Sequence, residues 1–215
     1  MKASTAIGLA GAGVALAIAA TLQWQSRDHV TTAGFWFDEV TFELPHLQAA
    51  GLGGPIDDRE RATIAATAWA EIQTAFAGFR LDLSQNRSAP YTVRVVQEFP
   101  PSRQLPFGAA GQSVVLAPLG GHGSVSFLML GSLAVRQAPP GATREVVIEG
   151  IGRGIGRAAV HEFAHQLLPR VVIDASVDDR SYEYEIAARP AQYYGDVHWS
   201  LARPYLDERL GRRAQ

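Results

Sequence analysis

The stretch His161-Glu162-Phe163-Ala164-His165 is the most informative part of this chain of 215 residues. On a helix, residues four positions apart lie one turn apart on the same face, so both imidazoles can reach one metal ion. The glutamate between them is rotated by about 100° from His161 around the helix axis. It can hold a metal-bound water without being a ligand. The stretch therefore predicts a zinc site with His161 and His165 as ligands and Glu162 as the catalytic base.

The helix that carries these residues is expected to run from Thr143 to Leu168, where Pro169 ends it. Four glycines alternate with other residues over 150–156, upstream of the two histidines. Their spacing does not fit the dinucleotide-binding fingerprint, and no clear strand precedes them. We therefore interpret these glycines as small residues that let another part of the backbone approach a buried helix.

Composition limits the class of protein and the kind of metal site. The chain is 47% hydrophobic and 19% charged, which is typical of a globular domain. Its net charge is −2 and it has no basic run, so nucleic acid is not an expected partner. It has no cysteine, so histidines and carboxylates must hold any metal ion.

Residues 1–24 have the pattern of a signal peptide or an N-terminal membrane anchor. Lys2 precedes an apolar run from Ala6 to Leu22, and the small residues Ala17 and Ala19 suit cleavage. The run is also close to the shortest length that spans a bilayer, so an uncleaved anchor is the alternative. A buried helix of the domain is a third interpretation. The first two predict export, to the periplasm or another extracytoplasmic compartment, with membrane association possible.

The rest of the chain is expected to form a linker and entry segment over residues 25–54 and one domain over residues 55–215. The elements expected in the domain are a helix over 57–78, strands over 91–95, 113–117 and 125–130, the long helix over 143–168, and helices over 181–194 and 199–210. Gly120 to Gly123 is interpreted as a turn.

The His161–His165 stretch and the order of elements over residues 55–200 resemble the zincin metallopeptidases. The resemblance implies an α+β fold in which a small, twisted, mainly antiparallel sheet packs over the active-site helix. It also implies that a helical C-terminal part supplies a third zinc ligand, and that the chain is a peptidase with a peptide or protein substrate. Neither the substrate nor the oligomeric state follows from the sequence.

Several residues could supply the third ligand of the predicted site. Metzincins would have Gly at position 168 and His at 171, but this chain has Leu168 and Val171. Gluzincins take a glutamate from a later helix, and Glu183 and Glu185 lie in that range. Glu185 has the separation from the second histidine that thermolysin-like enzymes show, although Arg189 stands where they have a companion aspartate.

Helical geometry favours Glu183 over Glu185 as the metal ligand. In a regular helix Glu183 falls within an apolar arc, and Glu185 lies nearly opposite it. The two are about 200° apart, so at most one can face the metal. A buried carboxylate needs a partner, and zinc would be one.

Three aspartates and a histidine are further candidates. Asp174, Asp178 or Asp179 could supply an aspartate ligand, as in aspzincins, although the surrounding pattern of that group is missing. His198 could be a ligand or a catalytic donor to the transition state, or simply a packed side chain beside Trp199.

The sequence therefore predicts an exported or membrane-tethered zinc peptidase in which Glu162 is the general base. Tyr193 and Tyr194 are alternatives to His198 as the donor to the oxyanion. Two other classes of protein fit the same residues. One is a non-catalytic envelope protein whose zinc site is closed by a fourth ligand, and the other is a metal-free protein that keeps only the scaffold.

Overall fold

The computed structural model describes residues 30–100, 110–116, 120–168, 172–185 and 187–213. Residues 1–24, predicted to be a signal peptide or an anchor, lie outside the described residues, and so does Pro169, predicted to end the long helix. In the part of the chain that is described, no helix has the length and apolar character needed to cross a membrane.

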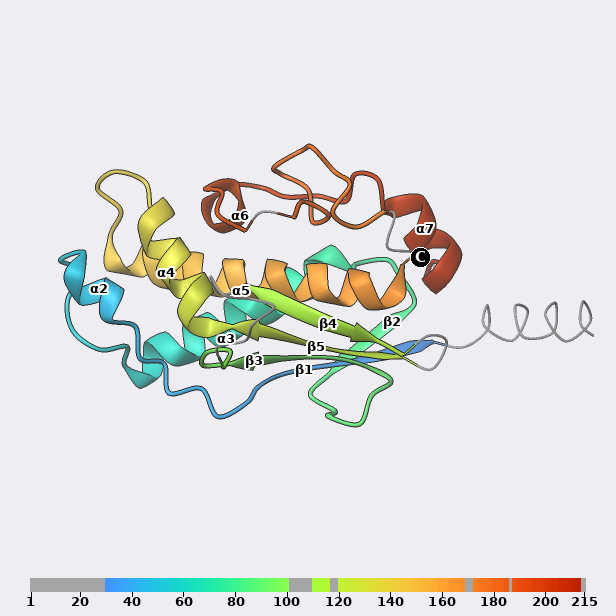
Figure 1. Ribbon diagram of the computed structural model, residues 1–215, viewed down its shortest axis with the longest axis horizontal. Coiled ribbons are helices and arrows are strands. Elements are labelled where there is room, and N and C mark those ends of the chain that lie inside the picture. The colour runs from blue at the N-terminus through green and yellow to red at the C-terminus, as the bar shows by residue number, and fades with distance from the viewer. Residues whose placement is uncertain (1–29, 101–109, 117–119, 169–171, 186, 214–215) are drawn as a thin grey trace, which may run out of the picture.

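The fold is α+β, with one mixed sheet and helices packed against it (Figure 1). The strands are β1 (Thr31–Phe37), β2 (Leu81–Ser84), β3 (Tyr91–Val96), β4 (Gly111–Val115) and β5 (Gly121–Ser126). The helices are α2 (Pro45–Ala49), α3 (Asp58–Ala75), α4 (Phe127–Gln137), α5 (Arg144–Leu167), α6 (Ala191–Tyr194) and α7 (Arg203–Leu210).

The sheet is mostly parallel, so the prediction of a mainly antiparallel sheet is wrong. Its order is β2-β1-β3-β5-β4, and only the pairing of β4 with β5 is antiparallel. The reason lies partly in α3, which connects β1 to β2 as a crossover helix and so lets the two strands run in the same direction.

Part of the segment predicted to be a linker contributes to the core. β1 lies between β2 and β3 in the sheet, and its Ala33 and Phe35 are buried. They belong to the same buried cluster as Val93 and Val95 of β3 and Ile155 of α5. Residues 31–37 are therefore part of the domain.

The third predicted strand is displaced along the chain. The structure has β5 at 121–126, within the glycine-rich stretch interpreted as a turn, and α4 begins at Phe127. Ser126 ends the strand and caps the helix, because its hydroxyl accepts a hydrogen bond from the Met129 N–H. Gly121 and Gly123 are suited to β5 because a Cβ there would lie 2.6 and 2.9 Å from side-chain atoms of Gln166 on α5.

Other predicted elements are confirmed. α3 begins after Asp57, which forms a capping box with Glu60, and it buries Ile64, Ala68 and Ile72 one turn apart. α5 runs from 144 to 167 with Thr143 as its N-cap, as predicted. It lies between the sheet and α6, and it also packs against α3 and α4 (Figure 1).

The alternating glycines of α5 let the helix contact two neighbours closely, as the sequence predicted. A Cβ at Gly156 would lie 2.6 Å from the carbonyl oxygen of Ala68 on α3. A Cβ at Gly154 would lie 2.3 Å from the ring of Tyr193 on α6. These contacts fix α5 between its neighbours and thereby fix the two histidines near its end.

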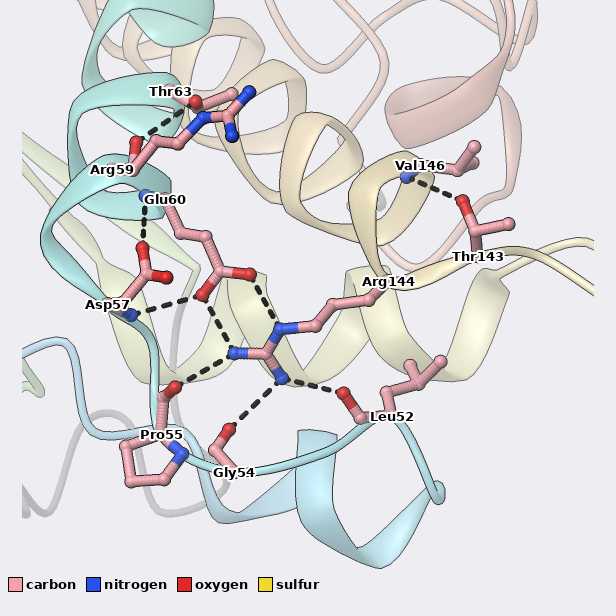
Figure 2. A network of polar contacts seen from close by, with 10 residues as sticks. All are labelled: Leu52, Gly54, Pro55, Asp57, Arg59, Glu60, Thr63, Thr143, Arg144 and Val146. Carbon is pink, nitrogen blue, oxygen red and sulfur yellow. Dashed lines mark hydrogen bonds and ion pairs between the residues drawn. The ribbon is translucent and has the colours of Figure 1, made fainter.

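One polar network joins the starts of α3 and α5 (Figure 2). The Arg144 guanidinium donates to both carboxylate oxygens of Glu60, at 2.6 and 2.8 Å. It also donates to the carbonyl oxygens of Leu52, Gly54 and Pro55. A planar fork with five N–H donors is needed to satisfy all these acceptors at once.

Arg144→Lys is therefore expected to lower the free energy of unfolding by about 1–2 kcal/mol at pH 7. Hydrogen bonds from Arg144 hold the pKa of Glu60 below its usual value of 4.5. A carboxylate with a depressed pKa stabilises the fold above its unfolded-state pKa, and this contribution is lost as the pH falls through the folded-state value. Urea unfolding should therefore show a difference in the free energy of unfolding between the native protein and Arg144→Lys at pH 7. The difference should become smaller as the pH falls below 4.5. Arg61→Lys is the control, because Arg61 pairs with a fully exposed Asp58.

Candidate metal centre

Two histidine nitrogens face each other near the end of α5. The Nε2 atoms of His161 and His165 are 3.0 Å apart. The Nδ1 of His161 lies 2.8 Å from the carbonyl oxygen of Tyr182. Since a carbonyl only accepts, Nδ1 carries the hydrogen, and Nε2 of the neutral ring presents its lone pair to the gap. Such a contact is the usual way in which a metal-binding imidazole is oriented.

Asp174 completes a group of three ligand atoms. Its Oδ1 is 3.1 Å from His161 Nε2, and its Oδ2 is 3.6 Å from His165 Nε2. In a tetrahedral site with zinc bonds of 2.0–2.2 Å, ligand atoms are separated by about 3.3–3.6 Å. The separations here are close to that range, so one zinc ion fits among the three side chains. Among the residues that the structure describes, this is the group with the spacing of a metal site.

The turn after α5 places Asp174 at this point. Asp174 has a φ of 67°, and its N–H donates to the carbonyl oxygen of Glu183. A positive φ is uncommon for residues other than glycine, but aspartate is among those that tolerate it. The backbone of the 172–174 turn therefore brings the carboxylate beside the two imidazoles.

Glu183, the ligand favoured by the sequence, is buried elsewhere. Residues 181–185 and 187–190 do not form the predicted helix, so Glu183 has no helical face on which to lie. The carboxylate is 0% exposed, as expected, but its partners are protein groups. It accepts hydrogen bonds from the backbone N–H groups of Ser200 and Ala202 and from the Ser181 hydroxyl. Glu183 thus joins the 181–183 turn to the segment before α7 and is not in the His–Asp group.

Glu185 and His198 are also outside the group of ligands. Glu185 lines the pocket that contains the histidines, but it is not one of the three clustered residues. The His198 side chain is 59% exposed, pairs with Asp178 at 3.2 Å and does not line that pocket. The structure therefore does not bring His198 to the position that a catalytic role would require.

Of the two tyrosines considered as donors, Tyr193 lines the pocket. Its hydroxyl is buried and has no hydrogen-bond partner among the described residues. The Tyr194 hydroxyl donates to the carbonyl oxygen of Ala134. The Tyr194 hydroxyl is therefore already engaged, whereas the Tyr193 hydroxyl is buried at the wall of the pocket.

The Glu162 side chain extends from α5 to β4, where it lies against Gly111. It is 6% exposed, and its Oε2 has no hydrogen-bond partner among the described residues. Burial raises the pKa of Glu162, against the opposing effect of His161. Burial lowers the pKa of His161, but Asp174 and Glu162 outweigh this, so that its pKa is raised overall. An unpartnered buried oxygen beside a ligand is suited to hold a water at a metal ion.

Gly111 of β4 gives Glu162 its space, which the sequence analysis did not foresee. A Cβ at position 111 would lie 2.2 Å from Glu162 Oε1 and 2.8 Å from its Cδ. The carboxylate must therefore move if residue 111 has a side chain. The sequence carries only a weak sign of this, a glycine at the start of a strand.

If Glu162 is the base of the peptidase predicted from the sequence, Gly111→Ala should lower peptide hydrolysis by about 100-fold, because moving a catalytic group by about 1 Å has an effect of this size. Zinc content should not change, since the ligands are on other residues. Steady-state kinetics and elemental analysis would measure both. Gly54→Ala is the control, because a Cβ there meets nothing within 4 Å. Unchanged kinetics for Gly111→Ala would contradict the assigned position of the base.

An open pocket of about 300 Å³ contains the three ligands and Glu162. It extends along one face of α5 from His165 and His161 to Ala158 and Gly154, at helical spacing. The opposite wall comes from α4, α6, Tyr182, Tyr184, Glu185 and Ala187. The pocket is therefore larger than a metal ion and its water require.

Comparison with known proteins gives no relative, since no family model, no curated protein and no solved structure matches this chain.

Proposed function

We propose that the protein is a zinc-dependent peptidase, exported or tethered to a membrane by its N-terminal segment. The observation that carries the proposal is the arrangement of His161, His165 and Asp174 around one point, with Glu162, whose Oε2 has no hydrogen-bond partner among the described residues, in the same pocket. Three protein ligands are the number that catalytic zinc sites use, because a fourth position must stay open. No fourth residue of the described chain belongs to the group, which disfavours a closed structural site.

Zinc held by these three side chains would polarise a peptide carbonyl and lower the pKa of a water toward 7. Glu162 would take a proton from that water as its oxygen attacks the carbonyl carbon. It would then pass the proton to the leaving nitrogen as the C–N bond breaks. A raised pKa suits both steps, since the same carboxyl must hold a proton and release it.

The substrate chain would lie along β4. This strand is at one edge of the sheet, beside the pocket, and Gly111 at its start lines that pocket. Val114 and Val115 are exposed, and the outer edge of β4 pairs with no strand of the described chain. An extended peptide could add to this edge through backbone hydrogen bonds.

Metal analysis with an activity assay tests the proposal. We expect one zinc ion per chain and hydrolysis of unstructured peptides by the purified protein. A chelator should abolish hydrolysis, and added zinc should restore it. Zinc bound without hydrolysis of any peptide in a broad mixture would indicate a structural site. If the protein contains no zinc even after purification with zinc present, it belongs to the metal-free class that keeps only the scaffold.

A further inference from the structure

The pocket has room for a substrate side chain beside the metal position. Ala158 leaves the face of α5 open there, because its side chain is only a methyl group, whereas the ring of Tyr193 packs against Gly154. Leu130 of α4 and Ala187 form apolar parts of the wall. An aliphatic chain of several carbons could therefore be buried along this part of α5.

Most charges that line the pocket are already balanced. The buried Arg157 guanidinium donates to both carboxylate oxygens of Glu71, at 3.0 and 3.1 Å, and also to the carbonyl oxygen of Ala191. Asp174 and Glu162 together carry two negative charges, which one zinc ion would offset. These groups leave no net charge to attract a substrate.

Glu185 is the remaining charge in the pocket. It is exposed, and within the described residues it makes no hydrogen bond or ion pair. Its neighbour Tyr184 also lines the pocket, and the Arg189 guanidinium lies 6.0 Å from the centre of the Tyr184 ring. Arg189 itself does not line the pocket, and its guanidinium donates a hydrogen bond to the Tyr184 hydroxyl at 3.4 Å. The pocket thus combines apolar walls, an aromatic ring and one carboxylate that lacks a countercharge.

We propose that this part of the pocket binds a lysine or arginine side chain of the substrate, next to the bond that is cleaved. The aliphatic stem would pack against Leu130, Ala158 and Ala187, and the cationic end would pair with Glu185. The inference rests on the proposed peptidase function. It adds a preference for basic residues and assigns it to Glu185.

Measuring kcat/KM for a set of peptides that differ at one position, with the native protein and with variants, would test this preference. The peptides carry lysine, arginine, norleucine or glutamate at that position and are blocked at both ends. We expect kcat/KM to be about fivefold or more higher for lysine and arginine than for norleucine, and lowest for glutamate. Glu185→Gln should bring the lysine-to-norleucine ratio close to one. Glu208→Gln makes the same change of charge at an exposed position of α7, and it should leave the ratio unchanged.

Binding measured without turnover separates this inference from the proposed function. Fluorescence anisotropy with the zinc-loaded Glu162→Gln protein should show tighter binding of the lysine and arginine peptides than of the norleucine and glutamate peptides. The double variant Glu162→Gln/Glu185→Gln should lose this preference for basic peptides. Cleavage with no preference for basic residues would overturn the inference and leave the peptidase function standing. Preferential binding of basic peptides that the native protein does not cleave would overturn the peptidase function and leave the preference for basic residues standing. A preference seen only with an unblocked N-terminus would assign Glu185 to the terminal amine and would also overturn the inference.

Discussion

Glu162→Gln is expected to lower kcat for peptide hydrolysis by about 100- to 10,000-fold, the range for loss of a general base. The amide has nearly the shape of the carboxyl group, but it cannot take a proton from water. Glutamine at this position should fit the same space beside Gly111, because the side-chain length does not change. Zinc content should stay at one ion per chain, since the three ligand atoms belong to His161, His165 and Asp174.

The measurement combines single-turnover kinetics with elemental analysis on the same preparation. Glu149→Gln is a matched control on the same helix, because Glu149 pairs with Arg153 and does not line the pocket. It should leave both activity and zinc unchanged. Hydrolysis at the native rate by the Glu162→Gln protein would remove the proposed base. Loss of zinc from that variant would mean that Glu162 is itself a ligand.

The helix that carries the site could be predicted from local chemistry. Thr143 caps α5, the glycines suit a buried helix, and the spacing of the two histidines places them on one face. Each of these features depends on residues within a few positions of one another. The same is true of the capping box at Asp57, which sets the start of α3.

The third ligand could not be predicted in the same way, because its position depends on a turn and not on a regular element. The sequence argument assumed that Glu183 lies on a helix, and it correctly expected the carboxylate to be buried with a partner. The partner is a set of backbone N–H groups from residues 200 and 202, which are distant in sequence. Asp174 was considered, but its positive φ and its contact with Glu183 appear only in three dimensions.

The mainly parallel direction of the strands could not be predicted either, because it also depends on contacts between distant parts of the chain. β1 lies in a stretch with weak alternation of polar and apolar residues, and its two neighbours in the sheet are β2 and β3. In the structure α5 packs against β3, β4 and β5, and α3 packs against α5, so the arrangement of the strands depends on contacts between residues distant in sequence. Parallel pairing also removes the short hairpins that would have been visible in the sequence.

Asp174→Asn is expected to weaken metal binding with little change in stability, whereas Glu183→Gln is expected to lower stability without affecting metal binding. Asparagine tolerates the positive φ at position 174, so the turn should persist while the ligand loses its charge. Zinc affinity should fall by about 100-fold or more, since the loss of a mere supporting contact already costs about 10- to 100-fold. The stability of the metal-free protein should change little. Competition with a chromophoric chelator would measure the affinity.

Glu183→Gln should instead lower the free energy of unfolding by about 3 kcal/mol, because the charged acceptor of the Ser200 and Ala202 N–H groups is lost in the interior. Zinc bound per folded chain should remain at one. Urea unfolding of metal-free protein, with zinc titration of the folded fraction, would separate the two effects, and Asp178→Asn serves as a control for the loss of one nearby carboxylate. If Glu183→Gln abolished zinc binding in a protein of native stability, the carboxylate would have to rotate to the metal. Asp174 would then be a second-sphere partner, and the ligand set would be the one first expected from the sequence.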